Sequence, residues 1–136
     1  MGMKKFIAGL AMSATMLCAG AAYAADIEVT HWWTSGGEAA AVAEFAKAVD
    51  ASGDKWVDGA IAGSGDVARP IIISRILGGN PMGATQLNPG KDADDLIAAG
   101  LLEDITDVAT AGDWANIQRP KSQLESCTKD GKVYCV

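Results

Sequence analysis

The sequence predicts an α/β fold in which a mainly parallel sheet is flanked by helices. Segments with the composition of strands alternate with segments of helical periodicity between residues 26 and 99, in the order βαβαβα. The connections between them are short and rich in glycine, which favours right-handed units of neighbouring parallel strands. The predicted strands are few and short, so the sheet is near the lower size limit for an independent α/β layer.

The first predicted strand covers residues 26–33, where polar and apolar residues alternate only loosely, as in a strand buried on both faces. Ser35 and Glu38 then have the spacing of a capping box, in which the Glu38 carboxylate bonds back to the Ser35 backbone. The following helix is expected to end near residues 52–53. Its apolar face is formed by residues at helical spacing, namely Val42, Phe45, Ala46 and Val49.

A second strand is predicted over residues 55–62, followed by a turn and a helix over residues 67–77 with Asp66 as its N-cap. The isoleucine run at 71–73 has strand propensity. The length of the segment and its stop signals, two glycines and then Pro81, favour a helix instead.

Residues 83–87 form the third predicted strand, which the Asn-Pro-Gly sequence at 88–90 interrupts. A helix continues from there to Ala99, because three aspartates crowd its first turn, where the helix dipole favours acids. After Gly100, residues 101–105 are expected to be a short extended or turn segment, and a helix broken at Pro120 is expected over 113–125.

The first 24 residues read as a bacterial export signal peptide rather than as part of the fold. Lys4 and Lys5 precede an apolar stretch, and Ala22-Tyr23-Ala24 is a small-x-small cleavage site. Cys18 lies inside this leader after a bulky leucine, which argues against a lipoprotein anchor. The formal net charge of -6 and the lack of a basic stripe argue against nucleic acid as a partner.

Cys127 and Cys135 are the two cysteines that remain after the leader is removed, and an oxidising compartment favours a disulfide between them. Asp130-Gly131 between them is typical of a hairpin turn. A strict two-residue loop would pair Cys127 with Tyr134 and would place the two sulfurs on opposite faces. We therefore expect an odd loop length or a bulge.

Five side chains are candidates for binding a polyhydroxylated ligand: Trp32, Trp33, Glu38, Gln86 and Asn88. An indole can cover the apolar face of a sugar ring, a carboxylate accepts from hydroxyls, and an amide both donates and accepts. Consecutive strand residues face opposite ways, so one tryptophan is expected to pack under a helix and the other to reach the ligand. The alternatives are core packing for both indoles, helix capping for Glu38 and turn initiation for Asn88.

Other chemistry is disfavoured by the sequence. Residues 63–68 match a dinucleotide fingerprint, but they follow the second strand and contain an aspartate that would repel a pyrophosphate. His31 has no nucleophile paired with it, and the aspartates at 92–95 lack the spacing of a calcium loop. We expect no metal site and no cofactor.

Four segments together resemble the extracellular solute-binding proteins of bacterial ABC sugar importers, within the maltose-binding-protein-like group and its glucose/mannose-type members. These segments are residues 32–38, 69–81, 84–90 and 130–135. The resemblance implies a periplasmic protein with two α/β lobes that close on a sugar, expected to be a hexose, and deliver it to ABC permease subunits. In relatives an acid at the position of Glu38 binds sugar hydroxyls, although the glycine spacer before it is one residue longer here.

The resemblance implies that residues 25–136 are the N-terminal part of the first lobe and that the sequence stops before the second. With only one side of a site, the fragment is expected to bind sugar weakly or not at all. Two alternatives are a secreted carbohydrate-active enzyme using Glu38 and a truncated product without function. The enzyme would need a second carboxylate, and the sequence offers no candidate for it.

Overall fold

The computed structural model describes residues 24–117 and 120–136. The predicted signal peptide, residues 1–24, lies outside the described residues except for Ala24. Among the helices of the described ranges, none is both long enough and apolar enough to cross a membrane.

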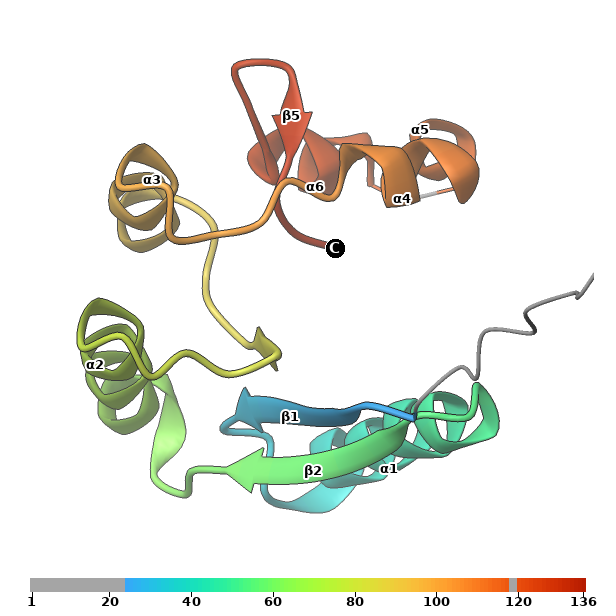
Figure 1. Ribbon diagram of the computed structural model, residues 1–136, viewed down its shortest axis with the longest axis vertical. Helices are drawn as coiled ribbons and strands as arrows, with labels where there is room; N and C mark the ends of the chain where they lie inside the picture. The colour runs from blue at the N-terminus through green and yellow to red at the C-terminus, as the bar shows by residue number, and fades with distance from the viewer. Residues whose placement is uncertain (1–23, 118–119) are drawn as a thin grey trace, which may run out of the picture.

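The centre of the fold is a parallel sheet in the order β2-β1-β3, formed by β1 (Asp26–His31), β2 (Lys55–Ala60) and β3 (Ala84–Thr85) (Figure 1). β1 pairs with β2 along its whole length, and its last residue, His31, lies opposite Ala60. On its other side, Thr30 of β1 pairs with Thr85 of β3. The predicted α/β class with a parallel sheet flanked by helices is therefore confirmed.

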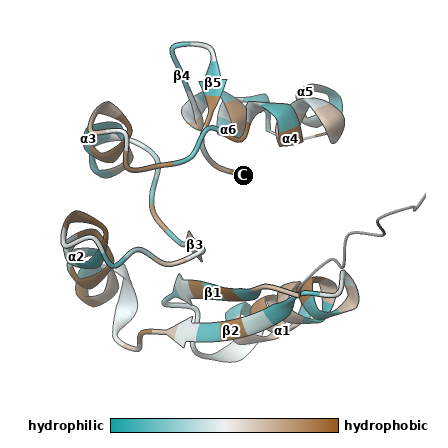
Figure 2. Cartoon of the chain, viewed as in Figure 1, coloured by the Kyte–Doolittle hydropathy of each residue, from teal (hydrophilic) through white to brown (hydrophobic). Residues whose placement is uncertain are grey.

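A helix follows each of the three strands: α1 (Gly36–Ala51) follows β1, α2 (Ser64–Leu77) follows β2 and α3 (Lys91–Ala98) follows β3. Hydrophobic residues run along α2 (Figure 2), and its buried side chains form a core cluster with Leu96 of α3. The members from α2 are Ala68, Ile72 and Ile76.

The predicted apolar face of α1 is only partly correct. Val42 is buried, but the Phe45 side chain is 56% exposed. α1 contacts the sheet mainly through the edge strand β2. A single edge strand covers too little of the helix to bury the whole predicted face.

The glycine stop signals act as predicted at the ends of α2 and α3. Gly79 has φ 74°, and the next residue, Asn80, donates its backbone N–H to the Arg75 carbonyl at 3.0 Å. Gly100 has φ 68° at the corresponding position after α3. Both ends are Schellman motifs, which need a left-handed residue that glycine adopts without steric cost. The start of α2 differs from the prediction, because its N-cap is Gly63 and Asp66 lies in the first turn.

The C-terminal part contains α4 (Thr106–Ala111), α5 (Trp114–Ile117), α6 (Lys121–Ser126) and a short antiparallel hairpin. The sequence predicted a helix over 113–125 that is broken at Pro120, and Pro120 is indeed the N-cap of α6. The structure has two helices there, and residues 118–119 between them lie outside the described ranges.

Residues 101–105 contain no helix, in agreement with the extended or turn segment predicted there, and α4, which was not predicted, follows them. The Asp104 carboxylate accepts the backbone N–H of Thr106 at 3.0 Å and also the Thr106 hydroxyl. This local turn satisfies a donor at the start of α4 and also holds the pKa of Asp104 below its ordinary value.

The hairpin is formed by β4 (Thr128–Lys129) and β5 (Lys132–Val133), with Asp130-Gly131 as a regular two-residue loop. Both loop residues have positive φ, 50° and 77°, as a type I′ turn requires. The predicted bulge or odd loop is therefore wrong.

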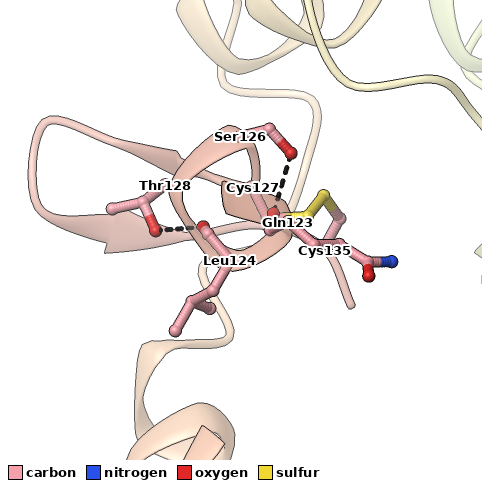
Figure 3. Close-up of a disulfide and its surroundings, with 6 residues drawn as sticks. All are labelled: Gln123, Leu124, Ser126, Cys127, Thr128 and Cys135. Atoms are coloured by element: carbon pink, nitrogen blue, oxygen red, sulfur yellow. Dashed lines mark hydrogen bonds between the residues drawn. A yellow bond between two sulfur atoms is a disulfide. The ribbon is translucent and has the colours of Figure 1, made fainter. Parts of the chain in front are cut away.

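The predicted disulfide between Cys127 and Cys135 is confirmed, with Cα atoms 5.0 Å apart (Figure 3). Tyr134 donates its N–H to the Cys127 carbonyl at 3.0 Å, as the two-residue loop demands. Cys127, however, is the C-cap of α6 and has helical backbone angles, φ -87° and ψ -4°. The rule that neighbouring strand residues face opposite ways does not apply to it, so its sulfur can reach Cys135.

A bidentate ion pair joins the central strand to α2. The two Arg75 terminal nitrogens donate to the Glu28 carboxylate oxygens at 2.6 and 2.9 Å. The two side chains are 27% and 33% exposed, so water screens the pair only in part. Hydrogen bonding to Arg75 lowers the pKa of Glu28 below its ordinary value of 4.5 and raises the pKa of Arg75.

This pair should make the free energy of unfolding depend on pH. Because the folded-state pKa of Glu28 is lowered, its contribution is complete above about pH 4.5 and is lost as the pH falls through the lowered value. Glu28→Gln should therefore lower stability at pH 7 and flatten the acid limb in denaturant titrations. Glu44→Gln is the control, since its pair with Lys47 is about 70% exposed on both sides and should contribute little. Equal effects of the two variants would contradict this assignment.

The disulfide should stabilise the hairpin locally. Its two cysteines are 8 residues apart, so the chain-entropy model gives a contribution of about 2–3 kcal/mol. The Cys127→Ala/Cys135→Ala variant should therefore show faster hydrogen exchange at the Tyr134 amide, with the amides of β1 as the internal control. Unchanged Tyr134 protection would contradict the prediction.

Candidate functional site

The carboxyl ends of β1 and β3 lie side by side at one edge of the sheet. The Thr30 carbonyl accepts the backbone N–H of Gln86 at 2.8 Å and the Thr85 hydroxyl at 3.1 Å. Open parallel sheets present ligand-binding residues at this edge, because the connections leaving the strands meet there. The residues that follow β1 and β3 are thus brought together by the sheet itself.

The structure places two of the five predicted site residues in direct contact. The Gln86 side-chain oxygen accepts the backbone N–H of Trp32 at 3.1 Å. Gln86 is half-buried, so this hydrogen bond is partly shielded from water. It links segments that are 54 residues apart in the sequence.

The two tryptophans lie just beyond β1, which ends at His31 and not at residue 33 as predicted. Trp32 is half-buried and packs against the core cluster of α2 and α3. A Cβ added to Gly65, at the start of α2, would lie 3.3 Å from the Trp32 ring. Trp32 is therefore the indole that packs under a helix.

Trp33 is half-buried but does not belong to the residues packed against that cluster. Its neighbour Trp32 already occupies the position against α2. Neither tryptophan is part of a strand, and the predicted contact of Trp33 with a ligand stays a prediction.

The capping box predicted for Ser35 and Glu38 does not form. Ser35 is the N-cap of α1, but its side chain makes no capping hydrogen bond. Gly36, the first residue of α1, has φ 58°, outside the helical range, so the usual geometry of a capping box is not reached. Glu38 is exposed in the first turn of α1, where the helix dipole favours a carboxylate.

Asn88 lies in the segment between β3 and α3 and is exposed. Within the described ranges, no hydrogen bond joins Asn88 or Glu38 to Trp33 or Gln86. The structure thus joins Trp32 to Gln86, with Trp33 next to Trp32 in the chain, while Glu38 and Asn88 follow β1 and β3 at the same edge without a hydrogen bond to them.

A contact between His31 and Asp58, which was not predicted, supports this edge. The imidazole Nε2 of His31 lies 2.8 Å from the Asp58 carboxylate, and His31 is 5% exposed. This contact fixes the end of β1 to β2 and agrees with the structural role expected for His31. The closest sequence signal is the alternation of the two strands, which places both side chains on one face once the register is known.

A hollow with a volume of about 810 Å³ lies between α2 and α3, away from the sheet edge. Its lining includes Arg69, which is ion-paired with Asp66 at 2.8 Å and with Asp92 at 3.8 Å. None of the five predicted residues lines it. We regard the sheet edge as the candidate site, because the Gln86 side chain contacts the backbone of the Trp32-Trp33 corner there.

Comparison with known proteins shows similarity to curated proteins named "Probable sugar-binding periplasmic protein". The chain is 39% identical over 117 residues to the one from Rhizobium meliloti (strain 1021), 85% of this chain and 28% of that protein. It is 34% identical to those from Brucella suis biovar 1 (strain 1330) and Mesorhizobium japonicum (strain LMG 29417 / CECT 9101 / MAFF 303099), over 82% of this chain. No protein-family model matches the chain. The chain spans about 28% of the length of the curated relatives that it matches.

The pairing of β1 with β2, which supports the candidate site, should be weakened by a side chain at position 59. Gly59 pairs with Thr30, and an added Cβ would lie 2.8 Å from the Thr30 hydroxyl and 2.9 Å from the Val29 carbonyl. Gly59→Ala should therefore lower the free energy of unfolding by about 1–3 kcal/mol.

Gly37→Ala is the matched control, because its Cβ would meet nothing within 4 Å and the residue lies in a helix. This variant should be neutral or more stable by up to about 1 kcal/mol. Chemical denaturation measures both, and a Gly59→Ala protein as stable as wild type would show that β1 and β2 are less closely paired.

Proposed function

We propose that this chain is part of a periplasmic sugar-binding protein of an ABC carbohydrate import system. The carboxyl edge of the sheet would supply one side of the sugar site. The observation that carries the proposal is the hydrogen bond that joins the Trp32-Trp33 corner to the Gln86 amide at this edge, in a chain similar over most of its length to proteins named as sugar-binding. Indole faces and amide groups are the chemistry that sugar recognition needs.

The surroundings of the indoles suggest distinct roles. Trp32 packs against α2 and would support the site, whereas Trp33 would stack on the apolar face of a monosaccharide. Glu38 makes no capping bond at Ser35 and is exposed, so its carboxylate would accept from sugar hydroxyls. Asn88, exposed at the same edge, would add a further hydrogen bond.

The remaining parts of the proposal rest on the same reasoning. The predicted signal peptide at residues 1–24 would direct the protein to the periplasm. A binding protein without catalysis is favoured over a glycoside hydrolase, because hydrolysis requires a second carboxylate placed opposite Glu38. The ligand would be a hexose, and the partners would be the permease subunits in the inner membrane.

Sugar binding by this 136-residue chain alone should be weak. Glu38 and Asn88 are exposed, so the described residues would leave the far face of a sugar in water. A titration with D-glucose should therefore give a Kd of about 1 mM or weaker. Trp33→Ala should weaken binding about tenfold through loss of stacking.

The titration is followed by NMR at the indole N–H groups. Phe45→Ala is the matched control, because Phe45 is an aromatic residue 56% exposed on α1 and lies outside the proposed site. A Trp33→Ala variant that responds to glucose like wild type would refute the stacking role. No response of wild type to any hexose at high concentration would count against sugar binding by this chain.

A further inference from the structure

The hydrogen bond between Gln86 and Trp32 occupies the position where the β1–β3 ladder would continue. In a parallel ladder with Thr30 opposite Thr85, the Gln86 N–H donates to the Thr30 carbonyl, as observed at 2.8 Å. The next rung would join the Trp32 N–H to the backbone carbonyl of Gln86. The structure instead shows the side-chain oxygen of Gln86 accepting that N–H at 3.1 Å.

The chemistry of this contact fixes the orientation of the Gln86 amide. A backbone N–H is a donor only, so the group facing Trp32 must be the side-chain oxygen and not the nitrogen. The two N–H donors of the amide nitrogen are consequently directed elsewhere. Within the described residues no acceptor for them is found.

We infer that Gln86 is a positioning residue that closes the end of β1 and thereby orients the Trp32-Trp33 corner, while its NH₂ group remains available to a ligand. The pairing of β1 with β3 ends where the Gln86 side chain replaces a main-chain acceptor. After this point the chain turns away from β1 at Trp32 and Trp33. Loss of the acceptor would release the Trp32 amide and the turn into Trp33.

The second part of the inference rests on the proposed function. A ligand oxygen at the Gln86 nitrogen must accept a hydrogen bond there, because an amide nitrogen is a donor only. A sugar hydroxyl that accepts from Gln86 keeps its own proton for another acceptor, and the exposed Glu38 carboxylate offers one. Gln86 would thus favour a hydroxyl or ring oxygen in an acceptor role.

Two variants of nearly equal size separate the two roles. Gln86→Glu keeps an oxygen for the Trp32 N–H at pH 7 but replaces the NH₂ donor by an acceptor. Gln86→Met removes both the oxygen acceptor and the NH₂ donor. Without sugar, hydrogen exchange at the Trp32 amide should stay within about twofold of wild type in Gln86→Glu and should be about tenfold faster in Gln86→Met.

Gln123→Met, which changes an exposed glutamine on α6, is the control for the loss of an amide and should leave Trp32 exchange unchanged. Fast exchange in Gln86→Glu, or wild-type exchange in Gln86→Met, would overturn the positioning role. With D-glucose as the probe, Gln86→Glu should respond at least threefold more weakly than wild type, and an unchanged response would overturn the donor role. A wild type that does not respond to glucose counts against the proposed function alone, because the exchange test needs no sugar.

Discussion

The geometry of the candidate site depends on the pairing of β1 on both of its sides. Thr30 is fully buried at the centre of this arrangement, opposite Gly59 on β2 and Thr85 on β3. Its carbonyl accepts two hydrogen bonds from the β3 side, while the missing side chain at Gly59 lets β2 approach closely. Trp32 leaves the sheet two residues later and Gln86 one residue after Thr85. Their contact is therefore a consequence of the register, and the same register holds both tryptophans at the edge.

Features encoded by a few adjacent residues were predictable from the sequence. The ends of α2 and α3 follow from Gly79 and Gly100, because a left-handed residue after a helix needs no information from the rest of the chain. The order of strands and helices, and hence the parallel sheet, follows from periodicity. The disulfide followed from the number of cysteines. Its geometry did not, because whether Cys127 ends a helix or begins a strand is settled by packing of α6 against the hairpin.

Features that depend on distant residues were not predictable, and one local pattern was misleading. Ser35 and Glu38 have the spacing of a capping box, but Gly36 enters α1 with positive φ and the box does not form. Phe45 has the helical spacing of a core residue, yet α1 meets mainly the edge strand β2, which leaves the ring exposed. The sequence placed Gln86 at the correct edge. It could not identify Trp32 as the hydrogen-bond partner, because that contact spans 54 residues.

The absence of the capping box changes which hydrogen bonds the sheet edge can offer to a ligand. A carboxylate engaged with the backbone of Ser35 would have part of its accepting capacity occupied, whereas the exposed Glu38 retains it near the positive end of the helix dipole. Gln86 changes in the opposite sense, because one lone pair of its oxygen is engaged with Trp32 while its two N–H donors have no acceptor among the described residues. The edge therefore combines a carboxylate that only accepts with an amide whose unengaged groups are mainly donors. A hydroxyl, which both donates and accepts, complements such a pair.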